Sequence, residues 1–512
     1  MGIGHIMRSL ALAEGLRERS VDVQFVCGDL PGNMVDFLRQ RSSDVALLPR
    51  FWSPDEAASD ADYGEGLGAT QSQDAEQTSG ALRGAHLDWL IVDHYALDAE
   101  WESRLRSYAN GVLVIDDLAN RRHDCDLLVD QNFSTSMQDR YRGLIPLDCR
   151  SLIGPTFAIL RPEYRQKRND ATHGTVEVRR IFIFFGGSDP KNLTGMAIDA
   201  LCDPQFADLQ VDVVIGVNNP HWQALEKAAS RRPHTQLYGP RLHLADLMAK
   251  ADLSIGAGGA TTWERMCIGL PSVTVSVAEN QRPACQALAE AGLIAYVGHH
   301  TAVRAADLVS TLQRVLGRQD ELADISLRSR LMVDGWGAQR IVEMMQPTSR
   351  SSLRLRPTIP DDLFHYFSWA NDSDVRAQSI QMEQIPFESH QKWFTGKLGS
   401  PDSRLFVMEA GDLPVGQIRF DREGNEQRIG YSIDKLFRGR GWAARLVELG
   451  IARLAAAKGV VFRAEVKEPN PASRRVFSRL GFSELSSEHA SGLKIFRFDP
   501  SRQTLNIDPK LE

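Results

Sequence analysis

Short apolar runs alternate with helix-like stretches along the first part of the chain. The runs Val21–Asp29, Leu87–His94 and Gly111–Asp117 are almost continuously apolar, and each ends in polar residues. Between such runs, Arg8–Arg19 carries apolar residues at the spacing of one helix face. Buried strands that alternate with helices predict a parallel, doubly wound sheet. We therefore expect residues 1–160 to form one α/β domain.

A second series of the same kind covers residues 161–345. Its strand Ile181–Phe185 runs into Gly186 and Gly187, and the alternation of strands and helices then continues. Two halves with a glycine turn each predict paired Rossmann-like domains that face a cleft, with ligands beyond the carboxyl ends of the strands. In contrast, Phe51–Gly84 is rich in Asp, Ser, Gly and Gln, and we expect it to contain a mobile surface excursion.

The remainder of the chain has a different pattern. Residues 346–352 are polar and without periodicity, which predicts a linker. Residues 353–500 begin with a strand and a helix, and they contain a hairpin pattern around Gly411–Pro414. A strand, a basic glycine turn and a long amphipathic helix follow, which predicts an α+β domain. We expect residues 501–512 to be a polar tail.

Composition limits the function classes. The chain has 512 residues, 43% hydrophobic and 24% charged, as in soluble multidomain proteins. The net charge of -7 gives no electrostatic reason to expect binding to nucleic acid or to an anionic membrane. The six cysteines never occur in C-x-x-C spacing, so we expect reduced thiols and no metal site. Without a long apolar run or a signal-peptide pattern, the chain is expected in the cytoplasm.

The third domain contains a motif that suits a pyrophosphate. Arg438, Gly441 and Ala443 fill an R-x-x-G-x-A pattern between a strand and a helix. Small residues let backbone N–H groups close around a phosphate, and the helix N-terminus adds partial positive charge. The alternative is an arginine-rich turn that only caps a solvated helix.

A second motif follows one helix and one strand later. Asn470, Ser473 and Phe477 lie in an N-x-x-S-x-x-x-F-x-x-x-G-F run. Together the two motifs resemble the GNAT acetyltransferase family over nearly the whole third domain. The resemblance implies acetyl-CoA between two splayed strands, Arg428–Ile433 and Phe462–Val466. It places the following residues at acetyl-CoA: Ile433, Arg438, Gly439, Arg440, Gly441, Trp442, Ala443, Asn470 and Ser473.

One position departs from the family pattern. Many GNAT members carry a tyrosine that acts as general acid where this chain has Phe477, and phenylalanine cannot donate a proton. Glu426, Glu465 and Tyr431 are possible proton-transfer groups, although such acidic residues are often only solvated or salt-bridged. The segments SWANDSDVRAQS and HQKWF resemble the branch that acts on small-molecule or N-terminal amines.

Polar clusters also follow the strands of the first two domains. The sharpest is the glycine-rich segment Gly256–Gly259, which leads into Thr261, Thr262 and Glu264. A glycine turn opens a helix toward phosphate, threonines can cap or donate, and a carboxylate suits both hydroxyls of a ribose. Glu264 could equally be an ordinary first-turn glutamate that the helix dipole favours.

The other clusters have structural alternatives as well. Asp117 and Asp124 could be helix caps, Gly186–Gly187 a tight turn, and His94 a structural histidine.

Six longer motifs follow one another along residues 1–345. They are GIGHIMRSLALA, IVDHYALD, VIDDLANRRHDCDLLVDQN, LIGPTFAILRPEY, FFGGSDPKNLT and AGGATTWERMCIGLPSVTVSVAENQ. These resemble the UDP-sugar hydrolase family of pseudaminic acid biosynthesis, which has two Rossmann-like domains in the GT-B arrangement. The resemblance implies removal of UDP from UDP-2,4-diacetamido-2,4,6-trideoxy-β-L-altropyranose, with His5 as the general base. The expected nucleotide-sugar contacts are Gly4, Asp93, Gly187, Ser188, Gly258, Gly259, Thr261, Thr262, Glu264, Asn280 and Gln281.

The fusion suggests consecutive steps on one substrate, since the same pathway acetylates the 4-amino group of the UDP-sugar before the hydrolase step. We expect a UDP-amino-sugar and acetyl-CoA as the partners of the chain. The alternatives are a GT-B glycosyltransferase, and a third domain that acetylates protein N-termini or only binds an acyl-CoA.

The first motif starts at the first residues of the chain. Members of the hydrolase family carry a strand before the G-x-G-H turn, whereas this sequence begins inside it. We expect the first domain to lack its leading strand, and a start codon assigned too late is the favoured interpretation. An edge exposed in this way would weaken the support of the loop that holds His5.

Overall fold

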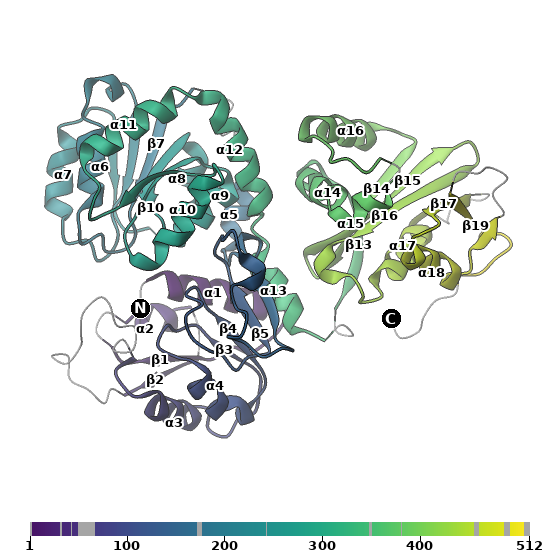
Figure 1. The fold of residues 1–512 in the computed structure, drawn as a ribbon, viewed down its shortest axis with the longest axis horizontal. Helices are drawn as coiled ribbons and strands as arrows, with labels where there is room; N and C mark the ends of the chain where they lie inside the picture. Colours follow the sequence, from purple (N-terminus) through teal and green to yellow (C-terminus); the bar gives the residue numbers. More distant parts are fainter. Residues whose placement is uncertain are drawn as a thin grey trace. The chain divides into compact units, whose positions relative to one another are not determined.

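The computed structural model describes residues 3–30, 33–41, 44–49, 67–170, 177–241, 243–347, 351–379, 381–454, 460–485 and 492–505. The chain divides into two compact units, Met1–Met345 and Gln346–Glu512 (Figure 1). Each unit has its own sheets. The first unit contains two α/β halves.

The parallel strands of the first half form two sheets. One pairs β1 (Phe25–Gly28) with β2 (Val45–Leu48), and the other has four strands: β3 (Leu87–Val92), β4 (Ala109–Ile115), β5 (Leu127–Asp130) and β6 (Arg150–Ile153). The parallel pairing was predicted, but a single sheet was expected. Among the described strands, β1 and β3 each pair on one side only.

Helices α1 (Ile3–Arg17), α2 (Val35–Arg39), α3 (Gln71–Ala81) and α4 (Ala99–Leu105) accompany these sheets. Helix α3 lies in the last part of the segment Phe51–Gly84, for which a mobile surface excursion was predicted. Its start is fixed by a capping box, in which the Thr70 hydroxyl accepts from the backbone of Gln73 and the Gln73 side chain accepts from the backbone of Thr70. Residues 51–66 of that segment lie outside the described residues.

The second half has one parallel sheet of six strands. Their order is β12, β11, β10, β7, β8, β9, with bounds β7 (Arg180–Phe184), β8 (Gln210–Val214), β9 (Thr235–Tyr238), β10 (Leu253–Ala257), β11 (Ser272–Ser276) and β12 (Ala295–His299). From the β9 edge this is the 3-2-1-4-5-6 order of a Rossmann fold. The strand order reverses between β7 and β10, so a crevice is expected beyond the carboxyl ends of these two strands.

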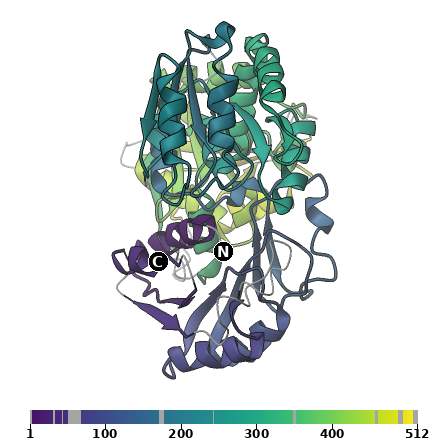
Figure 2. The same ribbon diagram turned by 90° about the vertical axis from the view of Figure 1, so that its left-hand side faces the viewer.

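Helices cover both faces of this sheet (Figures 1 and 2). One apolar core joins the sheet to α6 (Leu193–Ala200), α7 (Trp222–Ser230) and α11 (Ala305–Leu316), and a second joins it to α5 (Pro162–Lys167), α8 (Ala245–Lys250), α9 (Thr261–Ile268) and α10 (Arg282–Glu290). In β7, Ile181 and Ile183 belong to the first core and Phe182 to the second. A strand buried on both faces explains the continuous apolar run in the sequence.

The chain then returns to the first half. After α12 (Gln319–Met332), helix α13 (Gly337–Met345) packs against α1. The Trp89 indole N–H in β3 donates to the Met345 carbonyl at 3.0 Å. Both views show α1 at the boundary between the two halves of this unit (Figures 1 and 2).

The second unit is built on a seven-stranded sheet in the order β13, β14, β15, β16, β17, β19, β18. The bounds are β13 (Leu353–Pro357), β14 (Ser403–Ala410), β15 (Leu413–Glu423), β16 (Glu426–Ile433), β17 (Val461–Lys467), β18 (Ser483–Leu485) and β19 (Leu493–Phe498). Strands β14 and β15 form the predicted hairpin, and its turn contains Gly411 with a positive φ of 59°.

Among the described strands of this sheet, β16 and β17 are the one parallel pair. Their pairing ends at Ile429 and Ala464, and the strands then separate. Helices α14 (Leu363–Ala370), α15 (Ser373–Gln378), α16 (Phe387–Gly399), α17 (Trp442–Leu454) and α18 (Pro471–Arg479) complete the unit. The predicted splayed pair is therefore present.

No described helix is both long and apolar enough to cross a bilayer. Within the described residues, no three His, Cys, Asp or Glu side chains are grouped so that they could bind a metal ion.

Candidate functional site

The first turn of α1 brings His5 to the end of β3. His5 Nδ1 lies 2.7 Å from Oδ1 of Asp93, the first residue after β3. The His5 side chain is 11% exposed and the Asp93 side chain 8%. If Nδ1 carries the proton that Asp93 accepts, Nε2 keeps a free lone pair. The pair therefore provides a histidine whose tautomer and orientation are fixed by a carboxylate.

Arg8 stands one helical turn after His5 and binds the same carboxylate. Its Nε donates to Asp93 Oδ2 at 2.8 Å, and its Nη1 donates to Asp117 Oδ2 at 2.7 Å. Burial alone would raise the pKa of Asp93, but Arg8 and His5 lower it well below its usual range. Asp93 is therefore ionised at neutral pH and can stabilise a protonated His5.

A second set of contacts joins the two halves of the unit. The Tyr95 hydroxyl donates to Asp117 Oδ2 at 2.9 Å and accepts from Asn280 Nδ2 at 3.3 Å. The Tyr95 ring lies edge-on to His5, with ring centroids 4.6 Å apart. Oδ1 of Asp117 is buried and has no hydrogen-bond partner among the described residues. A carboxylate oxygen thus remains as an acceptor beside His5 and Tyr95.

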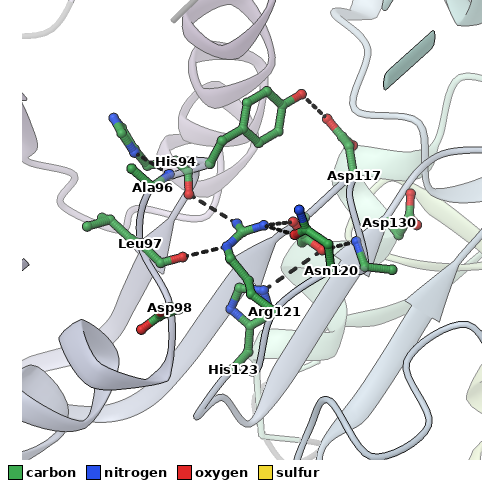
Figure 3. Close-up of polar contacts among 12 residues, drawn as sticks. His94, Ala96, Leu97, Asp98, Asp117, Asn120, Arg121, His123 and Asp130 are labelled. Carbon is green, nitrogen blue, oxygen red and sulfur yellow. Dashed lines mark hydrogen bonds and ion pairs between the residues drawn. The ribbon is translucent and has the colours of Figure 1, made fainter. Parts of the chain in front are cut away.

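The loop that carries Tyr95 is held by Arg121 (Figure 3). The Arg121 guanidinium donates to the carbonyls of His94 and Leu97 and to Asp116 Oδ1. Burial and the nearby His5 lower the pKa of His94 to about 4, and its Nδ1 accepts from the backbone N–H of Ala96. His94 is therefore a neutral, structural histidine in this loop.

Behind Arg121, a buried histidine lies between two carboxylates. His123 Nδ1 is 2.7 Å from Glu102 Oε1, and its Nε2 is 3.8 Å from Asp116 Oδ2. Burial opposes the charge of His123, but Asp116 and Glu102 raise its pKa to about 9. Through His123 the cluster joins Glu102 of α4 to Asp116, the residue after β4.

The glycine turn after β10 faces the start of α1 from the second half. A Cβ on Gly4 would lie 3.8 Å from the Ala260 Cβ, so the starts of α1 and α9 are close together. A Cβ on Gly258 would lie 2.2 Å from the Cys285 Sγ, which explains the glycine there. Gln281 Oε1 accepts from the Val277 N–H at 2.9 Å, and its Nε2 faces Gly259.

The two predicted phosphate loops differ in their helix N-termini. At α6, Asp189 accepts from the N–H groups of Leu193 and Thr194, each at 2.9 Å. A carboxylate therefore already occupies that N-terminus, with Gly187 half-buried and Ser188 exposed in the loop before it. At α9, no side chain caps the N-terminus. Of these two turns, the α9 turn is therefore the one without a side-chain cap in the described residues, although the N–H groups of Thr262 and Trp263 donate to the Gly259 and Ala260 carbonyls.

The other predicted residues of the α9 turn divide into two groups. Thr262 is 2% exposed and its hydroxyl accepts from buried Arg265 at 3.0 Å, so it packs beneath the turn. Thr261 and Glu264 are half-buried. Burial raises the pKa of Glu264, which the neighbouring Tyr164 hydroxyl and Arg161 oppose.

In the second unit, Gly439 and Gly441 both have left-handed backbones, with φ of 82° and 80°. A Cβ on either would meet no atom of the described residues within 4 Å, so the loop before α17 is open in that part of the chain. Arg438, in contrast, binds Asp372 and Asp374 at 2.6 and 2.8 Å and donates to the Ile433 carbonyl. It therefore fixes α15 to the loop.

The side chains next to the glycines of the loop before α17 pack against aromatic rings. Trp442 is 1% exposed and stacks on Phe437, with ring centroids 5.4 Å apart. The Arg440 guanidinium lies over both rings. Ala443 follows on α17 and is half-buried. The residues that shape this loop are therefore mostly packed, and its glycines form the open part.

The second acetyltransferase motif opens α18. The Asn470 side chain caps the helix by accepting from the Ser473 N–H at 3.0 Å. The Tyr431 hydroxyl, from the separated part of β16, donates to Ser473 Oγ at 3.0 Å, and its ring lies edge-on to buried Phe477. Burial raises the pKa of Tyr431 to about 12, so this hydroxyl is protonated at neutral pH.

Three residues of the first site were not in the predicted set: Arg8, Tyr95 and Asp117. Arg8 lies three positions after His5, a spacing that places both on one helix face. Tyr95 and Asp117 follow predicted strands. Their place beyond the strand ends was the sequence feature that could have identified them as site residues.

The comparisons with known proteins agree with the division of the chain into two compact units. The model of the Acetyltransferase (GNAT) domain family matches residues 352–483. The spore coat polysaccharide biosynthesis protein SpsG of Bacillus subtilis is 24% identical over 348 residues, 67% of this chain and 94% of the relative. The UDP-2,4-diacetamido-2,4,6-trideoxy-β-L-altropyranose hydrolase of Campylobacter jejuni is 23% identical over 293 residues, 57% of this chain and 93% of the relative.

One relative spans both units. An uncharacterized protein of Methanocaldococcus jannaschii is 22% identical over 508 residues, 94% of each chain. The chain thus joins a region similar to the hydrolase, with two Rossmann-like halves in a GT-B-like arrangement, to a GNAT domain. This confirms the predicted fold class.

Proposed function

We propose that the chain catalyses two consecutive steps on one nucleotide sugar. The GNAT domain transfers an acetyl group from acetyl-CoA to the 4-amino group of UDP-4-amino-4,6-dideoxy-N-acetyl-β-L-altrosamine. The first unit then hydrolyses the product, UDP-2,4-diacetamido-2,4,6-trideoxy-β-L-altropyranose, and releases UDP.

The His5–Asp93 pair carries the hydrolase proposal. A water molecule attacks the anomeric carbon and gives a proton to His5 Nε2, while the bond to the diphosphate oxygen breaks and UDP leaves with the electron pair. Asp93 stabilises the resulting imidazolium, as its depressed pKa allows. The N-terminus of α9, which has no side-chain cap in the described residues, and the Gln281 amide would stabilise the diphosphate; the predicted contacts Gly258, Gly259 and Thr261 belong to this turn.

The uridine is expected farther along α9. Glu264 is half-buried on this helix and can accept from the two ribose hydroxyls. Asn280 reaches across to Tyr95, so both halves would contact the sugar. Asp117 Oδ1, the unpartnered acceptor beside Tyr95, suits an N–H or O–H donor of the sugar.

The acetyltransferase step uses the separated strands β16 and β17. The open loop at Gly439 and Gly441, at the start of α17, fits a pyrophosphate group of acetyl-CoA. A neutral amine would attack the thioester carbonyl, and the departing thiolate needs a proton. Tyr431, protonated and hydrogen-bonded to Ser473, is a proton donor beside Phe477.

One incubation tests both steps. The full chain is mixed with the UDP-4-amino sugar, with and without acetyl-CoA, and the products are followed by NMR. We expect free sugar that is acetylated at position 4, together with UDP. Release of a sugar without that acetyl group would contradict the two-step order.

The rival activities give different outcomes. Strict dependence of UDP release on a second acceptor would indicate a glycosyltransferase. Acetyl-CoA consumption with peptides but not with the UDP-amino-sugar would indicate a protein N-acetyltransferase.

A further inference from the structure

The acetyltransferase unit contains a small polar cavity where β16 and β17 begin to separate. Its volume is about 260 Å³. Its lining residues come from the end of α15 and from β15, β16, β17 and β19: Gln378, Ser379, Arg419, Arg428, Ile429, Glu465, Lys467 and Leu493. Ile429 is part of the last paired rung, so the cavity lies at the fork of the two strands.

The lining has three cations and one carboxylate. Arg463 binds the carboxylate of Glu465 at 2.6 Å, so that negative charge is already compensated. Lys467 Nζ donates to the Ala377 carbonyl at 3.3 Å, and no described carboxylate lies within ion-pair distance of it. Arg419 and Arg428 also have carboxylate partners, Asp421 and Glu423, so the excess positive charge of the lining is that of Lys467.

Neighbouring side chains fix the positions of the two arginines that line the cavity, Arg419 and Arg428. Arg419 Nε lies 2.7 Å from Asp421, and its guanidinium lies over the Trp393 ring. Arg428 Nε lies 2.8 Å from Glu423. The Arg419 contact and the shorter Arg428 contact use Nε. Arg428 Nη2 also lies 3.8 Å from Asp421 Oδ2, which is beyond hydrogen-bond distance, so terminal N–H groups remain for a ligand. A fixed guanidinium loses little conformational entropy when it binds an anion.

The volume limits what the cavity holds. Sites for whole small molecules occupy about 300–1,000 Å³, so this cavity suits one charged group of a larger ligand. It is also linked to the predicted acetyl-CoA loop, because Asp372 and Asp374 at the start of α15 bind Arg438, while Gln378 and Ser379 at its end line the cavity.

We propose that this cavity binds the diphosphate of the acceptor, so that the amine is acetylated while UDP is still attached. This inference rests on the proposed function and adds a second nucleotide-sugar site, separate from the α9 turn. A free amino-sugar or a peptide N-terminus lacks the anionic group that the cavity fits. The 4-amino end of the same substrate then lies farther along the separated strands, beyond the last paired rung.

Steady-state kinetics of the full chain test the site. In the variant Arg428→Gln/Lys467→Gln, we expect KM for the UDP-4-amino sugar in acetyl transfer to rise roughly tenfold or more. KM for acetyl-CoA and the rate of UDP release from the acetylated UDP-sugar should stay unchanged. The matched control is Arg422→Gln, which removes an exposed cation from the same strand as Arg419.

Calorimetric titration with UDP gives a readout without catalysis. The intact chain should bind two UDP molecules, and the double variant should lose one of them. An unchanged acceptor KM in the double variant, or equally rapid acetylation of the free amino-sugar, would overturn the inference. If the intact chain acetylates no UDP-amino-sugar at all, the proposed function fails instead.

Discussion

His5 Nδ1 and Asp93 Oδ1 lie 2.7 Å apart, although 88 positions separate the two residues in the sequence. The contact joins the first turn of a helix to the end of a parallel strand. Arg8 binds the same carboxylate and also reaches Asp117, so the pair belongs to a buried network with alternating charges. Such a network fixes the imidazole orientation before any substrate binds.

Replacement of the base should separate the two activities. His5→Ala is expected to lower the rate of UDP release roughly 10²- to 10⁴-fold, because the attacking water loses its proton acceptor. Acetyl transfer, measured by thiol release from acetyl-CoA on the same preparation, should not change and serves as the control. Residual hydrolysis near the wild-type rate would assign the base to another residue.

Removal of the carboxylate should affect both activity and stability. Asp93→Asn leaves the buried Arg8 with only Asp117 as a charged partner, which should lower the free energy of unfolding by about 3–5 kcal/mol. UDP release should also fall, because the amide no longer favours the required tautomer. Urea unfolding and steady-state kinetics should be measured for both Asp93→Asn and His5→Ala. Because His5→Ala should keep the Arg8–Asp93 pair, it should lower UDP release without the large loss in the free energy of unfolding.

A pair of substitutions tests whether the α9 turn binds UDP: the first introduces a steric clash in the turn, and the second removes it. In Gly258→Ala, the new Cβ would meet the Cys285 Sγ at 2.2 Å, so the turn must shift and UDP should bind more weakly. Cys285→Ala removes that sulfur. The double variant should regain most of the UDP affinity measured by calorimetry, and no recovery would show that the turn tolerates no side chain there for another reason.

His123 should make stability depend on pH. Its pKa is about 9 in the folded chain and about 6.5 in an unfolded one, so the folded state holds the proton more tightly. The stabilisation is complete below pH 6.5 and is lost as the pH rises toward 9, by about 3 kcal/mol.

Urea midpoints at pH 6 and pH 9 measure this loss. In His123→Gln, we expect a lower midpoint at pH 6 and a smaller change between the two pH values. An equally steep change in the variant would assign the pH dependence to other groups.

Tyr431 should matter for acetyl transfer but not for hydrolysis. Its pKa of about 12 keeps the hydroxyl protonated, so it can donate to a departing thiolate but cannot act as a base at neutral pH. Tyr431→Phe should lower kcat of acetyl transfer about tenfold, with KM for acetyl-CoA unchanged. The double variant Tyr431→Phe/Phe477→Tyr moves the hydroxyl to the neighbouring ring. If acetyl transfer is restored in this double variant, a proton donor is needed at this place in the site.

The apolar pattern was sufficient for most of the fold. Strands such as β7 are buried on both faces, so the continuous run Ile181–Phe185 identified it without any other information. Helix α3 was missed because its polar sequence carries little periodicity and its start depends on the Thr70–Gln73 capping box. Side-chain caps of this kind depend on local geometry that composition does not reveal.

The site was predictable only in part. His5, Asp93 and the α9 turn were marked by their motifs, but their contacts depend on how separate strands and helices meet. Asp189 shows the difference: the sequence GGSDP suggested a phosphate loop, whereas the structure has its carboxylate on the α6 N-terminus. Likewise, Arg438 fits a pyrophosphate motif, and only the fold shows its pairing with Asp372.

The return of α13 to the first half has a practical consequence for dissecting the protein. Gly337 approaches the Ala158 carbonyl so closely that a Cβ would lie 2.2 Å from it, and Arg19 on the α1 side forms an ion pair with buried Glu343. A truncation that ends before Gly337 would strip α1, and with it His5, of its packing partner. A hydrolase fragment should therefore extend through Met345, and the two halves should not be expressed separately.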